Sequence, residues 1–309
     1  MSFIDLHCDT ASRIFYEKEG LKKNSFSVDI EKLKKGNCLG QVFAFFIDAG
    51  EVTNLESEFK SMYNTFISEI EKNKSEIEIV RNINELKSCE EKGKIGAFLS
   101  IEEGEVLKGD IKNLKRVYDM GIRFITLTWN YKNSLGYPNY IYKDKGLTSL
   151  GKDMVIEMEN LGIVPDCSHL SDEGFWDLIK ICKKPFIATH SNSREVTFHP
   201  RNLTDVMIKA LGNKGGVMGL NFCADFLGKN KVSSLEDMTK HIKHIKNVGG
   251  IEVLALGSDF DGIENKVEIE NSSKMDDLAF YLHKEGLKEG EIEKIFYKNV
   301  LRFIIENLK

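Results

Sequence analysis

Eight short apolar runs, rich in β-branched and aromatic residues, recur along the chain with amphipathic segments between them. Apolar runs of this length without polar alternation are typical of parallel strands that are buried on both faces. Eight strand–helix units in about 260 residues favour a (β/α)8 barrel of the TIM type over an open doubly wound sheet, which shows the same alternation. The runs span residues 3–9, 39–47, 95–101, 123–129, 162–168, 185–190, 215–222 and 252–259.

The segments between the runs place apolar residues three or four positions apart, which predicts helices that cover the barrel. These helical segments span 55–70, 110–120, 149–161, 171–182, 203–213 and 234–248. Beyond a polar loop at 262–273, we expect C-terminal helices at about 275–285, 289–297 and 299–308, which cover the bottom or flank of the barrel. The sequence thus predicts an α/β fold of one domain, residues 1–309, with extra C-terminal helices from about 275.

Composition and charge exclude several classes of partner. The chain has 43 Lys and Arg against 48 Asp and Glu, a net charge of −5, and no basic stripe that would mark a nucleic-acid surface. No run approaches the roughly 18 apolar residues of a membrane span, and the first residues do not resemble a signal peptide. Six cysteines without CxxC spacing predict reduced thiols rather than a disulfide framework. We therefore expect a cytoplasmic protein with no nucleic-acid or membrane partner.

Ionisable residues follow five of the eight runs. In a barrel of this type the chemistry lies at the carboxyl ends of the strands. His7 and Asp9 are two positions apart, so they share one face of the first strand. Charged groups gathered at one barrel mouth need a partner, and a divalent cation is the simplest one. The residues at these ends are His7 and Asp9, Glu102 and Glu103, His169, His190, and Asp259 and Asp261.

Imidazole and carboxylate ligands without thiolate suit Zn²⁺ or another first-row divalent metal. Three imidazoles and two carboxylates are enough for two metals if one carboxylate bridges them, and such a pair can share a hydroxide. Asp259 then has a separate role as the catalytic group that takes a proton from water and passes it to a leaving amine. The residues alone indicate a metal-dependent hydrolase. His241 and His244, three residues apart, are interpreted as a solvated helix face rather than a second metal site.

These strand ends resemble the motifs of the membrane (renal) dipeptidase family, the binuclear zinc peptidases among the amidohydrolase-like barrels. Seven short strings match in the family's order, and together they span residues 5–262. The strings are DLHCDT (5–10), SIEEG (100–104), TLT (126–128), DCSHLS (166–171), HSNS (190–193), RNL (201–203) and GSDFDG (257–262).

The resemblance implies a role for each matching residue. His7 and Asp9 would bind one zinc ion, His169 and His190 the other, and Glu102 would bridge them. Glu103 stands where the family usually has Gly, so the bridge could shift by one residue; Glu102 is favoured because it directly follows the last apolar residue of its strand. Arg201 would grip the free C-terminal carboxylate of a dipeptide, and Asp259 would lie beside the bridging water. The resemblance also implies a homodimer.

One position departs from the family. Relatives of the mammalian type have a histidine directly after Thr-Leu-Thr, where it helps to hold the substrate carbonyl, and this chain has Trp129 followed by Asn130. The indole N–H or the Asn130 amide is a possible replacement donor, and Trp129 is equally interpretable as a pocket wall.

The prediction is a dipeptidase that uses a hydroxide held between two zinc ions. Two alternatives stay open. One is a related amidohydrolase that acts on a lactam or an N-acyl amino acid, and the other is a catalytically degenerate binding protein.

Overall fold

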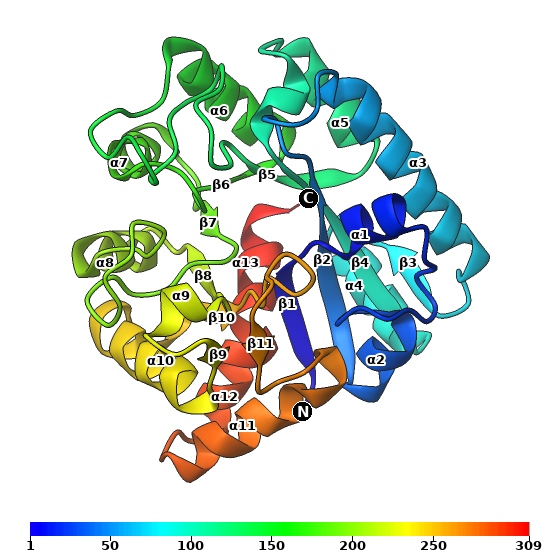
Figure 1. Ribbon diagram of the computed structural model, residues 1–309, viewed down its shortest axis with the longest axis vertical. Helices are drawn as coiled ribbons and strands as arrows, with labels where there is room; N and C mark the ends of the chain where they lie inside the picture. The colour runs from blue at the N-terminus through cyan, green and yellow to red at the C-terminus, as the bar shows by residue number, and fades with distance from the viewer. Residues whose placement is uncertain (309) are drawn as a thin grey trace.

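Eight parallel strands form a closed barrel in the computed structural model, which describes residues 1–308 (Figure 1). The barrel strands are β1 (Phe3–Cys8), β2 (Cys38–Phe46), β4 (Ile95–Glu102), β5 (Ile122–Thr126), β6 (Val164–Asp166), β7 (Ile187–Ala188), β8 (Val217–Leu220) and β10 (Leu254–Leu256). Each pairs with the next in this order, and β10 pairs with β1 to close the ring. Every strand lies within or overlaps one of the eight predicted runs, so the predicted (β/α)8 barrel is confirmed.

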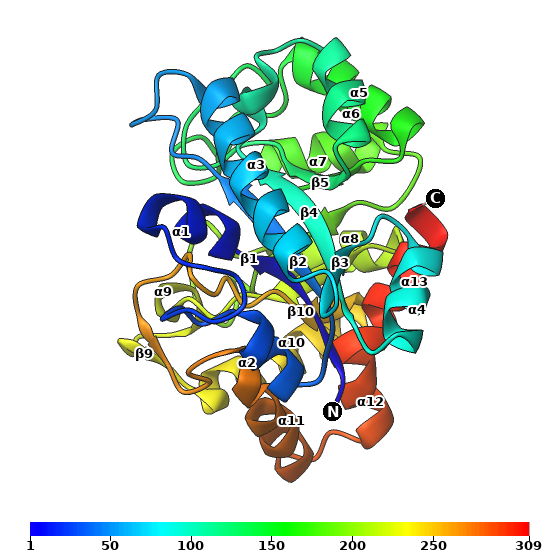
Figure 2. The same cartoon turned by 90° about the vertical axis from the view of Figure 1, so that its right-hand side faces the viewer.

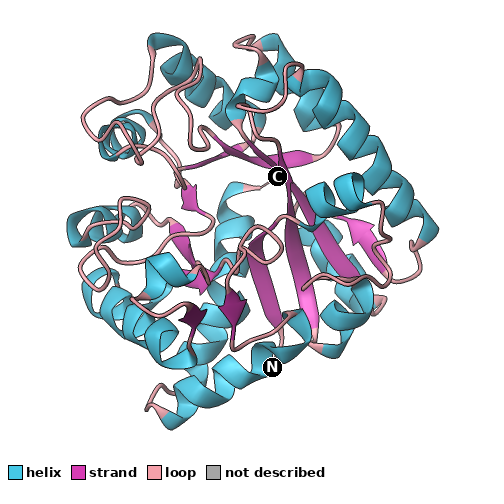
Figure 3. Ribbon diagram, in the orientation of Figure 1, coloured by secondary structure: helices cyan, strands magenta, loops and turns pink. Residues whose placement is uncertain are grey.

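Helices surround the barrel on its outside (Figure 3). Side-chain caps explain where several of them begin, since Thr148, Ser171 and Thr204 each accept a hydrogen bond from a backbone N–H in the first turn that follows. The helices before the C-terminal group are α1 (Thr10–Glu17), α2 (Ile30–Lys35), α3 (Leu55–Lys72), α4 (Ile83–Glu91), α5 (Lys112–Asp119), α6 (Ser149–Leu161), α7 (Asp172–Ile181), α8 (Asp205–Asn213), α9 (Ala224–Leu227) and α10 (Leu235–Gly249). Short 3₁₀ helices are η1 (Gly104–Leu107), η2 (Ile251–Val253) and η3 (Ser272–Lys274).

Several short elements were not predicted. The strand β3 (Ile77–Ile79) pairs with the first residues of β4, below the point at which β5 begins to pair with it. Two-residue strands β9 (Val232–Ser233) and β11 (Lys266–Val267) pair with each other, and β11 lies in the segment predicted to be a polar loop. Elements of two or three residues contain too few side chains to show a period, which is why sequence patterns miss them.

One apolar cluster fills the half of the barrel at the amino-terminal ends of the strands. All eight barrel strands contribute to it, and so does the last helix of the chain through Val300, Phe303, Ile304 and Leu308. Figure 2 shows this helix at one end of the barrel, with α1 and α9 at the other. The last helix therefore covers the amino-terminal ends of the strands, which is one of the two places predicted for the C-terminal helices. The C-terminal elements are α11 (Met275–Lys284), α12 (Glu289–Glu293), the π-helical η4 (Lys294–Lys298) and α13 (Asn299–Asn307).

Two further expectations concern the whole chain. Within residues 1–308, no helix combines the length and the apolar character that crossing a membrane requires. All six cysteines are free thiols, and five of them are buried. Within residues 1–308 the cysteines form no disulfide.

Candidate metal centre and active site

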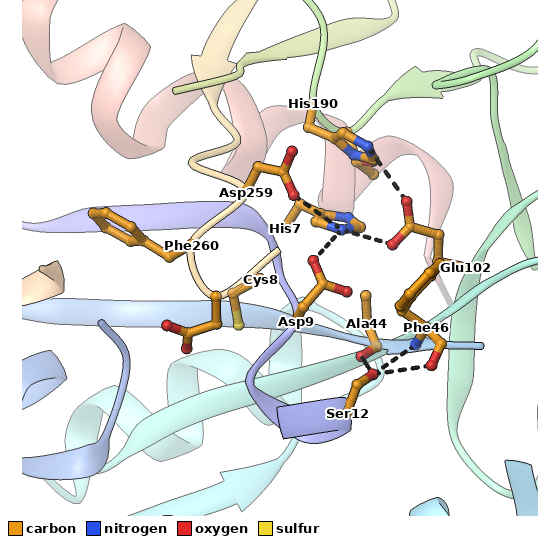
Figure 4. A network of polar contacts seen from close by, with 12 residues as sticks. His7, Cys8, Asp9, Ser12, Ala44, Phe46, Glu102, His190, Asp259 and Phe260 are labelled. Carbon is orange, nitrogen blue, oxygen red and sulfur yellow. Dashed lines mark hydrogen bonds and ion pairs between the residues drawn. The ribbon is translucent and has the colours of Figure 1, made fainter. Parts of the chain in front are cut away.

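The side chains of His7, Asp9, Glu102, His190 and Asp259 converge at the carboxyl ends of β1 and β4 and in the loops that follow β7 and β10 (Figure 4). Within this group, the Nε2 atom of His7 lies 3.4 Å from Asp9 Oδ2 and 3.9 Å from Asp259 Oδ1. His169, from the loop after β6, completes the predicted set on the far side of Glu102. The structure therefore brings all five predicted metal-binding residues and Asp259 to one place.

Glu102 lies between two groups of imidazoles. Its Oε2 is 3.0 Å from His7 Nε2, whereas its Oε1 is 3.1 Å from His169 Nε2 and 3.5 Å from His190 Nε2. One carboxylate oxygen thus faces each group, which is the arrangement that a bridging ligand requires.

Glu103 points elsewhere. Its carboxylate accepts hydrogen bonds from the Asn133 amide and from the backbone N–H groups of Glu105 and Trp129. This carboxylate therefore supports the loops beside the site, and its geometry favours Glu102 as the bridging residue.

The rings of His169 and His190 face each other with their Nε2 atoms 3.0 Å apart. His169 Nδ1 lies 2.9 Å from the carboxamide oxygen of Asn130, which only accepts, so this Nδ1 carries the proton and Nε2 is left with a lone pair. A lone pair aimed at a second imidazole nitrogen is unfavourable without a cation between them. Two nitrogen ligands of a tetrahedral Zn²⁺ stand about 3.3 Å apart, given Zn–N bonds of about 2.05 Å.

Buried carboxylates dominate the electrostatics of the site. Burial, and then the nearby Glu102, raise the pKa of Asp9 well above its usual value, and burial raises the pKa of Asp259 to about 6. Burial alone would lower the pKa of His7, but Glu102 and Asp9 outweigh it and hold that pKa well above its usual value. The protein alone therefore supplies too little positive charge for its carboxylates.

The residues present fit a divalent metal. Two buried atoms, His7 Nε2 and Asp9 Oδ1, have no hydrogen-bond partner, and although His7 Nε2 lies near Glu102, the angles are not those of a hydrogen bond. Buried polar atoms without hydrogen-bond partners are rare in proteins, and here they indicate that a ligand binds at this position. All candidate ligand atoms are imidazole nitrogen or carboxylate oxygen, which matches a first-row divalent ion. The Sγ atom of Cys8, which lies between His7 and Asp9 in the sequence, instead contacts the Thr10 hydroxyl oxygen at 3.3 Å.

Unusual backbone angles are concentrated around this cluster. Glu103, His169, Asp259 and Asp261 have φ values of 123°, 67°, 60° and 70°, a region that residues with a Cβ rarely adopt. Each such residue costs on the order of 1–3 kcal/mol, and strain of this kind collects at functional sites. The chain therefore turns sharply where the strands end around the cluster, and no sequence pattern predicts such angles.

Arg201 is 2% exposed and lies at the wall of a cavity of about 400 Å³ that also contains Glu102, His169 and Asp259. Its Nε and Nη1 atoms have no hydrogen-bond partner, although its guanidinium stacks 5.3 Å from the ring of Phe226. Burial lowers the pKa of Arg201, against the attraction of Asp259. A buried guanidinium with free donors that line a cavity is suited to an anionic ligand.

The loop that carries Arg201 is held in place by its neighbour. The Asn202 amide donates hydrogen bonds to the carbonyl groups of Ser193, Thr197 and Phe226. Three backbone segments are thereby tied to one side chain, which positions Arg201 against the cavity.

Trp129 and Asn130 also line the cavity. The indole ring packs 4.7 Å from Phe46 and 5.6 Å from Tyr131, measured between ring centroids, so Trp129 acts as a wall. Asn130 was predicted only as a hydrogen-bond donor to substrate, but its carboxamide oxygen also accepts from His169.

Several residues of the site were missed or misjudged. Asn221, directly after β8, donates to Asp259 Oδ2 at 2.9 Å, and its polar side chain within the predicted apolar run 215–222 is a signal that could have identified it. A Cβ at Gly262 would lie 2.0 Å from Asp9 Oδ2, so only glycine fits there. The expectation that His241 lies on a solvated helix face is wrong, because the side chain is fully buried and its Nδ1 accepts the N–H of Ser193.

Comparison with known proteins agrees with this geometry. The family described as membrane dipeptidase (peptidase family M19) matches residues 1–308. An uncharacterized dipeptidase of Schizosaccharomyces pombe is 30% identical over 302 residues, which cover 89% of this chain and 70% of that protein. An uncharacterized protein from the pqqA 5′ region of Klebsiella pneumoniae is 30% identical over 230 residues, covering 71% of this chain and 85% of that protein.

Solved structures show the same fold. The crystal structure of the dipeptidase AC, a metallopeptidase of family M19, has a TM-score of 0.93 at 24% identity and covers 100% of this chain and 99% of its own. A metallopeptidase from Rhodobacter sphaeroides, liganded with a phosphinate mimic of the dipeptide L-Ala-D-Ala, has a TM-score of 0.91 at 22% identity, with 99% of each chain covered. The chain belongs to the membrane dipeptidase family, peptidase family M19.

Proposed function

We propose that this protein is a dipeptidase with two zinc ions that hydrolyses dipeptides with a free C-terminal carboxylate. The buried Arg201 carries the proposal, because its unpartnered guanidinium and the candidate metal cluster share one cavity. A substrate that satisfies both must carry an anionic group close to a hydrolysable bond, as a dipeptide does. The dipeptide mimic bound to the Rhodobacter sphaeroides relative supports this substrate class.

In this proposal His7 and Asp9 would hold one metal ion, His169 and His190 would hold the other, and Glu102 would contribute to both. When bound, two divalent ions supply a hydroxide nucleophile at neutral pH and polarise the scissile carbonyl. The protein itself contributes orientation. Arg201 fixes the carboxylate end of the dipeptide through its fork of donors. The Trp129 ring, whose centroid is 6.2 Å from that of His169, limits the space beside this histidine.

Asp259 moves the proton. Its Oδ2 is held by the Asn221 amide, which leaves Oδ1 directed toward His7 and the metal cluster. Without metal ions, burial raises the pKa of this carboxyl to about 6, and a carboxylate in this position is suited to general-base catalysis. Oδ1 therefore takes a proton from the attacking water and donates it to the amine that leaves. The free amide hydrogens of Asn130 are available to the substrate carbonyl, since only its oxygen is bound to His169.

The test is metal analysis of purified protein combined with a panel of L,L and L,D dipeptides. We expect about two divalent ions per chain and turnover that disappears when the C-terminus is blocked as an amide. Arg201→Ala should raise KM for the free dipeptide and lose the discrimination against the amide.

Turnover of lactams or N-acyl amino acids in preference to dipeptides would favour the related amidohydrolase. Metal-loaded protein without any hydrolysis would indicate the degenerate binding protein. Protein that binds no divalent metal would contradict the proposal altogether.

A further inference from the structure

A buried hydroxyl and a buried carboxylate lie directly behind His190. The Thr189 Oγ1 atom is 2.8 Å from His190 Nδ1 and 2.5 Å from Asp166 Oδ2. Thr189 is 1% exposed and Asp166 is fully buried. These residues have no part in the function proposed above, so their contacts call for an explanation.

The donors around Asp166 determine where each proton lies. Its Oδ1 accepts the backbone N–H groups of Ser168 and Thr189, each at 2.9 Å, and its Oδ2 accepts the Thr126 hydroxyl at 2.7 Å. A carboxylate group only accepts, so the short contact from Thr189 must be a hydroxyl donated to Oδ2.

The direction of the remaining bond follows from this assignment. The Thr189 hydroxyl donates its one hydrogen to Asp166, so its oxygen can only accept a hydrogen bond from His190 Nδ1. The ring is thereby protonated at Nδ1, and Nε2 keeps its lone pair toward Glu102 and His169. The chain of bonds runs from His190 through Thr189 to Asp166 and fixes both the tautomer and the angle of the ring.

We propose that Thr189 and Asp166 are positioning residues that prepare His190 to bind a metal ion, an inference that rests on the proposed metal centre. Histidine ligands commonly donate their second N–H to an acceptor, and loss of that acceptor weakens metal binding by about 10- to 100-fold. Here the acceptor is a hydroxyl whose own orientation is set by a carboxylate. His169 differs, because its acceptor is the partly exposed Asn130.

The experiment compares Thr189→Val with Thr126→Val. Both variants remove one hydroxyl from Asp166 Oδ2 and replace it with a methyl group, but only Thr189 also contacts His190. Zinc content after dialysis and zinc affinity by competition with a chromophoric chelator are measured for each, together with Thr189→Ser. We expect Thr189→Val to bind one of its zinc ions about 10- to 100-fold more weakly. Thr126→Val and Thr189→Ser should stay within about threefold of the unsubstituted protein.

Thermal unfolding of the metal-free proteins supplies the second readout. Both valine variants should remain folded, with a somewhat larger loss of stability in Thr189→Val. Each leaves Asp166 short of one donor, and Thr189→Val also leaves the His190 Nδ1–H without an acceptor. A difference in zinc affinity then reports on His190 and not on folding.

The inference is overturned if Thr189→Val keeps both zinc ions at unchanged affinity, or if Thr126→Val loses as much affinity as Thr189→Val. It also falls if the unsubstituted protein binds no divalent metal. Because no dipeptide enters these measurements, an unsubstituted protein that binds zinc but cleaves nothing refutes the dipeptidase proposal alone.

Discussion

The two ends of the barrel are built from the same strands but on opposite principles. At the amino-terminal end, one apolar residue of nearly every strand packs with α13 in a closed cluster. At the carboxyl end, buried polar atoms such as His7 Nε2 and Arg201 Nη1 have no partner. In β4, Phe98 belongs to the first end and Glu102 to the second, four residues further along. Stability thus comes from one end, while the other tolerates strain and unpaired charge that a ligand can use.

The largest expected effect lies at the carboxyl end and concerns activity alone. Asp259→Asn removes the proposed proton carrier but keeps the contact with Asn221, so kcat should fall by about 10²- to 10⁴-fold while the metal content stays unchanged. Asp261→Asn is the matched control, because that carboxylate bonds to the Thr10 hydroxyl and the Ser27 backbone outside the metal cluster. Steady-state kinetics measure kcat for both variants, and metal analysis shows whether each keeps its metal ions. A kcat for Asp259→Asn within tenfold of the unsubstituted enzyme would remove Asp259 from the mechanism.

At the amino-terminal end, a substitution should reduce stability and leave activity unchanged. Phe303→Ala opens a cavity beneath the barrel and should lower the free energy of unfolding by about 3–5 kcal/mol. Ile305, two residues along α13, is 58% exposed, so Ile305→Ala should have little effect. Urea unfolding measures the loss, and kcat/KM under folding conditions should be unchanged in both variants. A lower kcat/KM in fully folded Phe303→Ala would show that the amino-terminal end also contributes to activity, and would contradict the division between the two ends.

The difference between the ends also explains what the sequence could predict. The barrel strands and C-terminal helices were predicted because burial on both faces or on one stripe leaves a periodic pattern. Glu102 and His190 were predicted because they stand at the carboxyl ends of apolar runs. The roles of Thr189 and the positive φ values of Asp259 and His169 leave no such pattern. The Thr189 contact with Asp166, for example, joins two residues that are 23 positions apart in sequence.

Acid sensitivity should belong to the carboxyl end as well. His241 accepts from the Ser193 N–H and lies 3.0 Å from the Leu227 carbonyl, and burial lowers its pKa to about 4, although Asp237 opposes this shift. Because the pKa is 6.5 in the unfolded chain, the unfolded state binds an extra proton as the pH falls from about 6.5 to 4. Stability is therefore retained above this window and lost within it, by about 3 kcal/mol in all.

His241→Asn keeps an acceptor for Ser193 but does not titrate, so its stability should decline less on acidification. Urea unfolding at pH 7.5 and pH 4.5 measures the decline, with the exposed His283→Asn as control. Identical declines in His241→Asn and the unsubstituted protein would exclude His241 as the source.

The smallest expected change in stability tests whether the unpaired Arg201 guanidinium lowers the stability of the ligand-free protein while it serves to bind substrate. Arg201→Met keeps a long side chain against Phe226 and removes two buried donors that have no partner. In metal-loaded protein without substrate, we expect the free energy of unfolding to stay the same or rise by about 1 kcal/mol, since an unsatisfied buried charge is costly. A dipeptide should raise the melting temperature of the unsubstituted protein far more than that of Arg201→Met. If Arg201→Met markedly destabilised the ligand-free protein, attraction to Asp259 and Glu102 would already offset the cost of burying the guanidinium. The carboxyl end would then be less strained than its unpaired atoms indicate.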